Sequence, residues 1–289
     1  MLAVLFGALA GLGFGLLAVA VRDALRRGGD AEVGALALAT VALTVAAAAA
    51  AAAGDFAHFH LGGLWQFFLI GMLVPGSSQI LFIQSIRLAG PSRAAILIGV
   101  APLASAAIAI TFLGEPARAG LLVETVLVVA GGVALARERA RPSHFRPLGA
   151  ALALLCALMF GIRDNLVRHA ADHSHAPPLL ATASTLLGSV AIVLAYLVVI
   201  RRRALRDRLP TSFRAFVPAG LTLGAAYIFL VEGLSHGRVT VVAPLNATQS
   251  IWGVVFAALL VGQAELIGRR TVAAGLLVVA GGALIGATR

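Results

Sequence analysis

The sequence has little charge for its length. Asp, Glu, Lys and Arg make up 12% of its 289 residues, and its mean hydropathy is +0.99. An ordinary soluble domain carries about 25% charged residues. A chain this poor in charge cannot cover a water-facing surface, but it can face lipid. These numbers therefore predict an integral membrane protein.

Lysine is absent, and all 22 basic residues are Arg, for a net charge of +10. The arginines form short clusters between apolar runs without interleaved aromatic residues. This pattern disfavours nucleic-acid binding and is typical of the cytoplasmic loops of membrane proteins. The one cysteine, Cys156, excludes an intrachain disulfide framework. Because the chain begins with an apolar Met1–Leu2 instead of a charged region, we expect its first hydrophobic stretch to be a retained span.

Apolar segments recur along the whole chain, each close to the roughly 20 residues that a spanning helix needs. They are continuously apolar instead of alternating, which favours helices over a barrel. The connections between them are short and polar, the longest being 137–147 and 201–214. The predicted fold is an all-α membrane protein with ten transmembrane helices at 2–21, 33–53, 63–86, 92–113, 119–136, 148–168, 178–200, 214–234, 238–262 and 270–288.

The distribution of arginine predicts the orientation. The loops that follow spans one, three, five, seven and nine contain 17 of the 22 arginines, and the opposite face contains 5. By the positive-inside rule the first set lies in the cytoplasm. With ten spans, both termini are then expected outside.

The sequence contains an internal repeat. Gly13-Phe14-Gly15 with Arg22 matches Met159-Phe160-Gly161 with Arg168 at an offset of 146, and Leu127–Gly132 matches Leu277–Gly282 at an offset of 150. We expect two five-helix domains, at 1–140 and 147–289. Because five is odd, the two copies enter the membrane from opposite sides. Inverted repeats are the architecture of many secondary transporters, with the substrate site near the midplane between the halves.

Several short motifs follow one another in a defined order. They are the Phe-Gly of spans one and six, the stretch from Ser92-Arg93-Ala94 to Ala101-Pro102-Leu103, Leu113-Gly114-Glu115-Pro116, and the Gly-Gly of spans five and ten. Together they resemble the drug/metabolite transporter superfamily, specifically its EamA-type ten-helix bacterial group. The resemblance implies a multi-pass protein of the cell inner membrane that exports small metabolites, such as amino acids, related compounds or xenobiotics.

Such a transporter is secondary active or facilitative and works by alternating access. The sequence contains no Walker motif, nucleophile–base pair or metalloprotease motif. We therefore expect no enzymatic activity and no cofactor. The expected partners are a small-molecule substrate, the lipid bilayer and protons as coupling ion, with no nucleic acid.

Three consecutive polar residues, Arg163-Asp164-Asn165, interrupt span six, where the equivalent positions of span one are Leu17, Ala18 and Val19. In a substrate site, Arg163 would offer a bidentate fork to a carboxylate, while Asp164 would attract an amine or carry a proton. The alternative is an Arg–Asp pair near the membrane interface that snorkels to water. Candidates for proton coupling are Glu124, Asp164 and Glu232, because ionisable residues at membrane depth are costly.

Uncharged polar residues gather in spans three and nine, which are partners in the repeat. They follow Pro75 and Pro244, and proline frees backbone carbonyls that are tolerated where they line a cavity. A central cavity with these groups would bind substrate; the alternative is interhelical hydrogen bonding that only holds the helices together. The candidate residues, with one aromatic from span eight, are Ser77, Ser78, Gln79, Tyr227, Asn246, Gln249 and Trp252.

Histidines and aspartates gather in two loops on the predicted external face: His169, Asp172, His173 and His175 after span six, and Asp55, His58 and His60 after span two. His and Asp bind transition metals, so the alternative function is a transition-metal ion transporter. The spacing fits no defined site, and loop histidines are usually solvated. We therefore assign no metal ligands.

Overall fold

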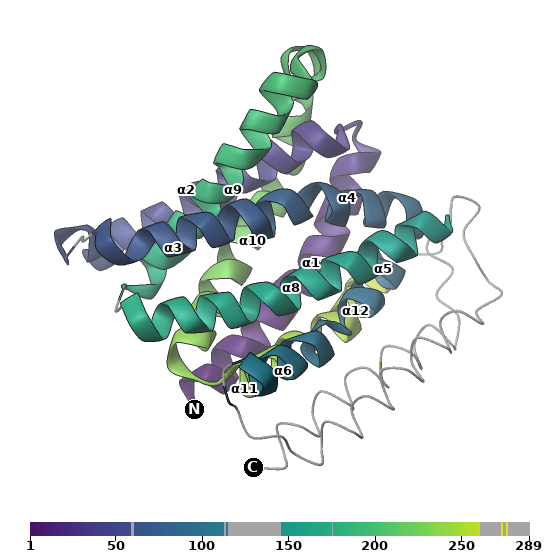
Figure 1. Ribbon diagram of the computed structural model, residues 1–289. Helices are drawn as coiled ribbons and strands as arrows, with labels where there is room; N and C mark the ends of the chain where they lie inside the picture. Colours follow the sequence, from purple (N-terminus) through teal and green to yellow (C-terminus); the bar gives the residue numbers. More distant parts are fainter. Residues whose placement is uncertain are drawn as a thin grey trace.

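The computed structural model describes residues 1–58, 61–112, 114, 146–174, 176–260, 273 and 276. Every regular element within them is helical (Figure 1). The elements are α1 (Leu2–Arg26), α2 (Ala31–Ala53), the 3₁₀ turn η1 (Asp55–His58), α3 (Leu61–Gly71), the π-helical segment η2 (Met72–Ser77), α4 (Ser78–Ala89), α5 (Pro91–Ile98), α6 (Ala101–Phe112), α8 (Pro147–Ser174), α9 (Pro178–Ile200), α10 (Arg202–His236), α11 (Val239–Asn246) and α12 (Gln249–Leu260).

Seven segments of the described chain are long and apolar enough to cross a membrane: Leu2–Arg26, Ala31–Ala53, Gly62–Ala89, Pro91–Phe112, Pro147–Ser174, Pro178–Ile200 and Arg202–His236. The predicted all-helical membrane fold is thus confirmed. The predicted span 238–262 is present as the two shorter helices α11 and α12. Predicted span 119–136 lies outside the described residues, as does most of 270–288, so the count of ten stays a prediction.

The alanine-rich helix α2 is defined by caps at both ends. The Asp30 carboxylate accepts hydrogen bonds from the backbone N–H groups of Glu32 and Val33, both at 3.0 Å. Gly54 closes the helix in the left-handed conformation, with φ 78°. Between these caps the small alanine side chains let other helices approach closely; Ala46 and Ala50, for example, are fully buried.

Two helices are interrupted in the same way at equivalent places. α5 has 8 residues and is separated by Gly99 and Val100 from α6, which has 12. α11 has 8 residues and is separated by Ala247 and Thr248 from α12, which has 12. Adding 148 to the bounds of α5 and α6 gives those of α11 and α12. Discontinuous helices in corresponding positions of two repeats are typical of secondary transporters.

Contacts between helices repeat as well. Gly161 of α8 packs against Ala104 of α6, where an added Cβ would lie 2.8 Å from the Ala104 Cβ. Gly15 of α1 packs in the same way against Trp252 of α12, where an added Cβ would lie 2.5 Å from the Trp252 Cβ. Glycine is required at both positions because the helix backbones nearly touch. Together with the paired interruptions, these contacts show a two-repeat architecture.

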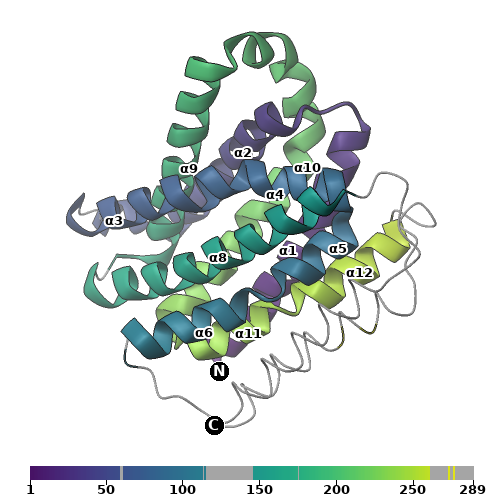
Figure 2. The same ribbon diagram turned by 45° about the vertical axis from the view of Figure 1, so that its right-hand side comes forward.

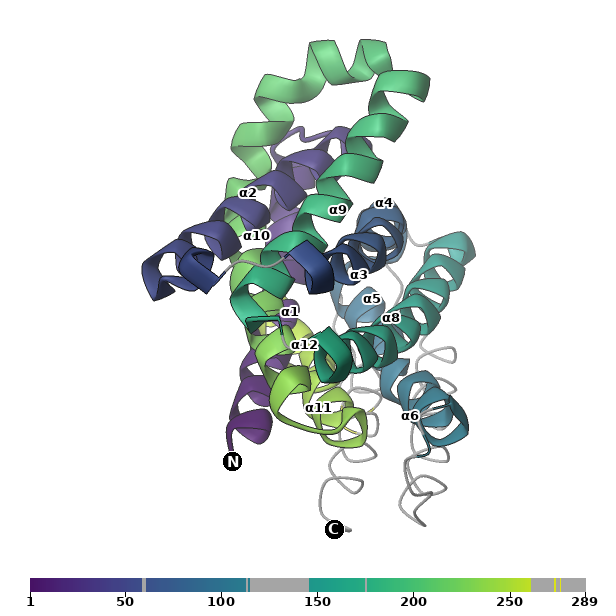
Figure 3. The same cartoon turned by 60° about the vertical axis from the view of Figure 1, so that its left-hand side comes forward.

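The segment 201–214 is not the polar connection that the sequence predicts. α10 begins at Arg202 and runs for 35 residues, which at 1.5 Å per residue is about 52 Å and exceeds the roughly 30 Å hydrocarbon core. Its first turns form a projecting hairpin with α9 (Figures 2 and 3). The helix persists there because Leu205 and Leu209, four residues apart, pack together against the core while the arginines between them face outward.

Candidate functional site

A buried cluster of charged and hydroxyl side chains lies where α6, α8 and α10 meet. Both Nε and Nη2 of Arg163 donate hydrogen bonds to Oδ1 of Asp164, at 2.9 and 2.7 Å. Nη1 of Arg163 donates to the Tyr227 hydroxyl at 3.2 Å. Oδ2 of Asp164 accepts from the Ser105 hydroxyl at 3.2 Å. The four side chains thus form one hydrogen-bonded network across three helices.

Aromatic rings from both repeats enclose the guanidinium of Arg163. Its Cζ lies 4.8 Å from the ring centroid of Phe160, 5.4 Å from that of Tyr227 and 5.9 Å from that of Phe14. These distances are within the range of cation–π attraction. Phe14 and Phe160 are equivalent residues of the two repeats, so the cation lies on the interface between them. Phe14 also meets Tyr227 edge-on, with centroids 5.8 Å apart.

The Arg163–Asp164 pair lies within the candidate membrane span Pro147–Ser174 and is buried. Arg163 and Asp164 are each 2% exposed, and α8 continues beyond them to Ser174. Side chains this buried argue against the snorkelling alternative, in which the charged groups reach water. Taking two charges out of water is expensive, and a buried pair is tolerated when its remaining atoms are hydrogen-bonded, as they are here.

Asn165 strengthens the contact between α8 and α6. Its Nδ2 donates to the backbone carbonyls of Ser105 and Gly161, both at 2.9 Å. Its Oδ1 is buried and has no hydrogen-bond partner in the described part of the chain. One of the three predicted polar residues of span six thus acts in helix packing, while the other two form the ion pair.

The serines of span three form hydrogen bonds at an interruption in their own helix. Pro75 cannot donate a backbone hydrogen bond, and Val74 leaves the helical conformation with φ −145° and ψ 119°. The Ser77 hydroxyl donates to the Met72 carbonyl at 2.9 Å, and the Ser78 hydroxyl donates to the Pro75 carbonyl at 3.2 Å. Gln79, on α4, is 4% exposed. The structure does not bring this group into the network around Arg163.

The polar residues of span nine form a separate group near α5. The Ser250 hydroxyl donates to the Ala95 carbonyl at 3.1 Å, and Asn246 and Gln249 are each 6% exposed. Trp252 stacks on Phe256 with centroids 5.8 Å apart. Among the residues that the structure describes, no hydrogen bond, ion pair or ring contact links Asn246, Gln249 or Trp252 to Arg163 or Asp164.

The other two candidates for proton coupling are not in the network. Glu232 lies near the end of α10, half-buried, with its Oε2 3.5 Å from Nδ1 of His236. Glu124 lies outside the described residues. Of the two candidate carboxylates that the structure describes, Asp164 is the one in the network around Arg163.

The histidine-rich loop shows local pairing. The rings of His169 and His173 are 4.2 Å apart, and Nδ1 of His173 lies 2.8 Å from the His169 carbonyl oxygen. Asp172 forms an ion pair with Arg168 at 2.9 Å. Within the described ranges, no three His, Cys, Asp or Glu side chains group as metal ligands. His60 and His175 lie outside those ranges, so the metal hypothesis gains no ligand set.

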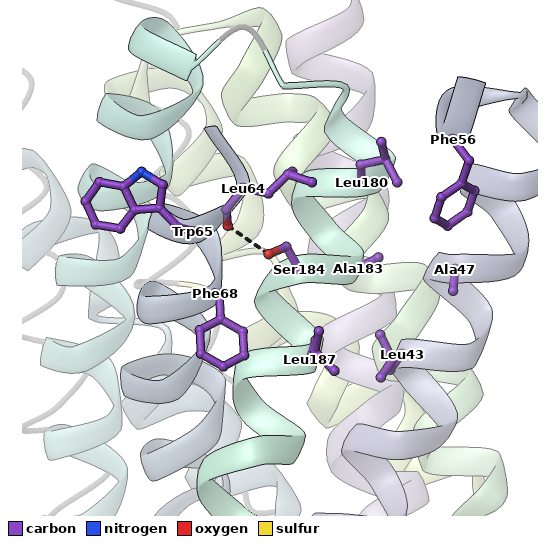
Figure 4. A pocket seen from close by; sticks show the side chains of 10 residues that line it. All are labelled: Leu43, Ala47, Phe56, Leu64, Trp65, Phe68, Leu180, Ala183, Ser184 and Leu187. Carbon is purple, nitrogen blue, oxygen red and sulfur yellow. Dashed lines mark hydrogen bonds between the residues drawn. The ribbon is translucent and has the colours of Figure 1, made fainter. Parts of the chain in front are cut away.

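A cavity of about 480 Å³ lies elsewhere, between α2, α3 and α9 (Figure 4). Leucine, alanine and aromatic side chains line it, and Trp65 is 56% exposed. Its one hydroxyl, from Ser184, already donates to the Leu64 carbonyl at 2.8 Å (Figure 4). A lining this apolar suits a hydrocarbon chain and offers little to orient a polar metabolite.

Sequence reasoning missed one member of the network, Ser105, and two of the rings around Arg163, Phe14 and Phe160. Ser105 is a single hydroxyl residue in an apolar run, and nothing in its spacing indicates that it meets Asp164. Phe14 and Phe160 were noted for their motif and not as site residues. Their equivalence in the repeat could have pointed to them, since substrate sites lie at the interface between inverted repeats and equivalent residues near the axis face that interface together.

These features together define a multi-pass membrane protein of the transporter class, built from two repeats with paired interrupted helices and a buried ion pair between them. The chain belongs to the EamA-like transporter family, whose model matches residues 1–137 and again residues 147–287.

The fold also matches solved structures. One of them, described only as a crystal structure of a protein, has a TM-score of 0.71 and 21% sequence identity to this chain, and the match covers 98% of this chain and 95% of the other. This likeness shows the fold alone. No curated protein matches the sequence.

Proposed function

We propose that this protein is a secondary active or facilitative transporter that exports small metabolites, amino acids or related compounds, across the bacterial inner membrane by alternating access. The observation that carries the proposal is the Arg163–Asp164 pair, buried where aromatic residues of both repeats meet. Ionisable residues in membrane spans mark substrate pathways and proton relays. The paired interruptions in α5–α6 and α11–α12 support the same class of mechanism.

The membrane topology belongs to this proposal. Each repeat contributes four described helical segments that cross or nearly cross the membrane: α1, α2, α3–α4 and α5–α6, then α8, α9, α10 and α11–α12. A fifth span in each, at 119–136 and 270–288, would complete domains 1–140 and 147–289. An odd number of spans inverts the second repeat, and the excess of arginine on one face places that face in the cytoplasm.

The network around Arg163 suits a substrate that carries both charges. The guanidinium is held by Asp164 and the Tyr227 hydroxyl. A substrate carboxylate would replace Asp164 at the planar fork of Arg163. A substrate amine would then bind the released carboxylate of Asp164. The ion pair would thus open to bind an amino acid and reclose after its release.

The same exchange provides a route for coupling to protons. An antiporter requires that substrate and proton compete for one group, and Asp164 binds either a substrate amine or a proton. Binding of one then excludes the other. Glu124 and Glu232 stay secondary candidates for this role.

Transport by the purified full chain tests the proposal. In proteoliposomes preloaded with a mixture of unlabelled amino acids, labelled amino acids should enter by counterflow. A pH gradient should drive net flux in wild type, and Asp164→Asn should remove the pH dependence. Absence of counterflow across a panel of amino acids and hydrophobic cations would reject the proposed substrate classes. Flux that is unaffected by the pH gradient would reject proton coupling.

A further inference from the structure

A second, basic cavity of about 420 Å³ lies at the end of the bundle away from the N-terminus. α1 runs from the marked N-terminus toward this end, where the α9–α10 hairpin projects (Figures 1 and 3). The lining comes from the end of α1, the connection between α1 and α2, the end of α4 and the first turns of α10. Four arginines contribute to it: Arg22, Arg26, Arg87 and Arg208.

Positive charge exceeds negative charge in this cavity. Its one acidic lining residue is Asp30, whose carboxylate is engaged as the cap of α2. Arg26, Arg87 and Arg208 are exposed, and they form no ion pair or hydrogen bond with any part of the chain that the structure describes.

Two carboxylates close in sequence to lining residues are engaged by arginines outside the cavity. Asp23 pairs with Arg27 at 2.7 Å, and Glu32 pairs with Arg201 at 3.0 Å. Neither Arg27 nor Arg201 lines the cavity. Asp23 and Glu32 therefore do not pair with Arg26, Arg87 or Arg208.

The end of α1 differs in charge from the equivalent part of α8 in the second repeat. Arg168, the counterpart of Arg22, has Asp172 one turn later and binds it at 2.9 Å. The residue one turn after Arg22 is Arg26. Like charges four residues apart destabilise a helix, whereas opposite charges stabilise it. The position one turn after the equivalent arginine is thus basic in the first repeat and acidic in the second.

The chemistry of the lining favours phosphate. Guanidinium groups bind phosphate oxygens through two parallel hydrogen bonds. Three backbone N–H groups of the α1–α2 connection are not available to bind a phosphate. Those of Gly28 and Gly29 donate to the Leu25 and Ala24 carbonyls, and that of Asp30 donates to the Ser212 hydroxyl. Recognition would therefore depend on the arginine side chains. Basic pockets between spans on the cytoplasmic side suit the headgroups of anionic lipids.

We propose that this cavity binds a phosphate group, carried either by the headgroup of an anionic phospholipid or by soluble phosphate. The site is separate from the Arg163 network, so it is tested by binding and not by transport. The probes for the detergent-solubilised full chain are phosphatidylglycerol, phosphatidylcholine and inorganic phosphate. The readouts are lipid retention in native mass spectrometry and the midpoint of thermal unfolding.

We expect phosphatidylglycerol to be retained and to raise the unfolding midpoint, and phosphatidylcholine to do neither. Protection by phosphatidylglycerol without protection by inorganic phosphate identifies a lipid source. Protection by inorganic phosphate, in competition with phosphatidylglycerol, identifies a soluble one. Equal retention of both lipids, with no protection by inorganic phosphate, would overturn the proposal.

Variants separate this cavity from general surface charge. Arg87→Gln and Arg208→Gln should each weaken phosphatidylglycerol binding about tenfold, or about 1.4 kcal/mol, since each removes one charged hydrogen-bond donor. Arg203→Gln removes the same charge from an exposed position of α10 that does not line the cavity, and it should bind as wild type does. An equal loss in Arg203→Gln and Arg208→Gln would show that the cavity has no special role.

Discussion

The first helices of the two repeats bury equivalent positions to the same extent with opposite chemistry. In α1, Leu17, Ala18 and Val19 are at most 2% exposed; in α8, Arg163 and Asp164 are each 2% exposed and Asn165 is 4% exposed. Packing alone therefore does not require charge at this level of the bundle. The polar residues of α8 are an addition to an architecture that is also built without them, which is why we associate them with function.

Removing one charge from α8 should give the largest difference in stability between equivalent positions of α1 and α8. Asp164→Ala leaves the guanidinium of Arg163 buried without its carboxylate. Removing one partner of a buried pair costs about 3–5 kcal/mol. We expect a loss of that size in the free energy of unfolding, measured by denaturant titration in detergent. The matched control is Ala18→Gly, at the equivalent position of α1, which should cost about 1 kcal/mol. Similar losses in the two variants would show that the ion pair has no special energetic role.

Converting α8 to the residues of α1 sharpens the same point. The double variant R163L/D164A has the side chains of Leu17 and Ala18 in place of the ion pair. Replacing a buried pair by apolar residues is often neutral or stabilising, so we expect it to recover most of the stability that Asp164→Ala loses. Under the proposed function it should be inactive in counterflow. A double variant that transports normally would show that the pair is dispensable for transport.

The glycines that hold the repeats together should behave alike. An added Cβ at Gly15 or Gly161 would lie within 3 Å of a residue on the interrupted helix opposite. We expect Gly15→Ala and Gly161→Ala each to cost about 1–3 kcal/mol of unfolding free energy, as overpacking does. Gly62→Ala is the control, because nothing lies within 4 Å of its added Cβ. A large loss in one repeat and none in the other would contradict the equivalence of the two contacts.

The positions of the helices were well predicted from the sequence, but the contacts between residues of different helices were not. Apolar length located the described spans, because a run of about 20 apolar residues has few alternatives in a membrane. The helical Arg202–Arg214 was missed because its charges suggest a loop, while Leu205 and Leu209 alone mark its buried side. Gly99 marks the break between α5 and α6, but Ala247 and Thr248 give no such indication between α11 and α12.

The network itself depends on how helices cross. Arg163 and Asp164 were predicted as site residues because charge is rare in membrane spans, whereas Tyr227 was predicted as part of a cavity with spans three and nine and not as a partner of Arg163. Ser105 could not be predicted, since its meeting with Asp164 depends on the angle and depth at which α6 passes α8. Periodicity along one helix carries no information on that geometry. Ser77 and Ser78 differ, since their carbonyl partners are local to η2 and depend on the break at Pro75.

The smallest expected effects come from the hydroxyl groups that surround the ion pair. Ser105→Ala and Tyr227→Phe each remove one hydrogen bond, to Asp164 and from Arg163 respectively. A net hydrogen bond to a charged group is worth roughly 1.5–3 kcal/mol, and one between neutral groups about 1 kcal/mol. Because the direct Arg163–Asp164 bonds remain, we expect losses at the lower end, about 1–1.5 kcal/mol. Combined with R163L/D164A, either substitution should cost less than it does in wild type, since its charged partner is gone. Losses that simply add in such a double-mutant cycle would show that the hydroxyls act on the helices and not on the ion pair.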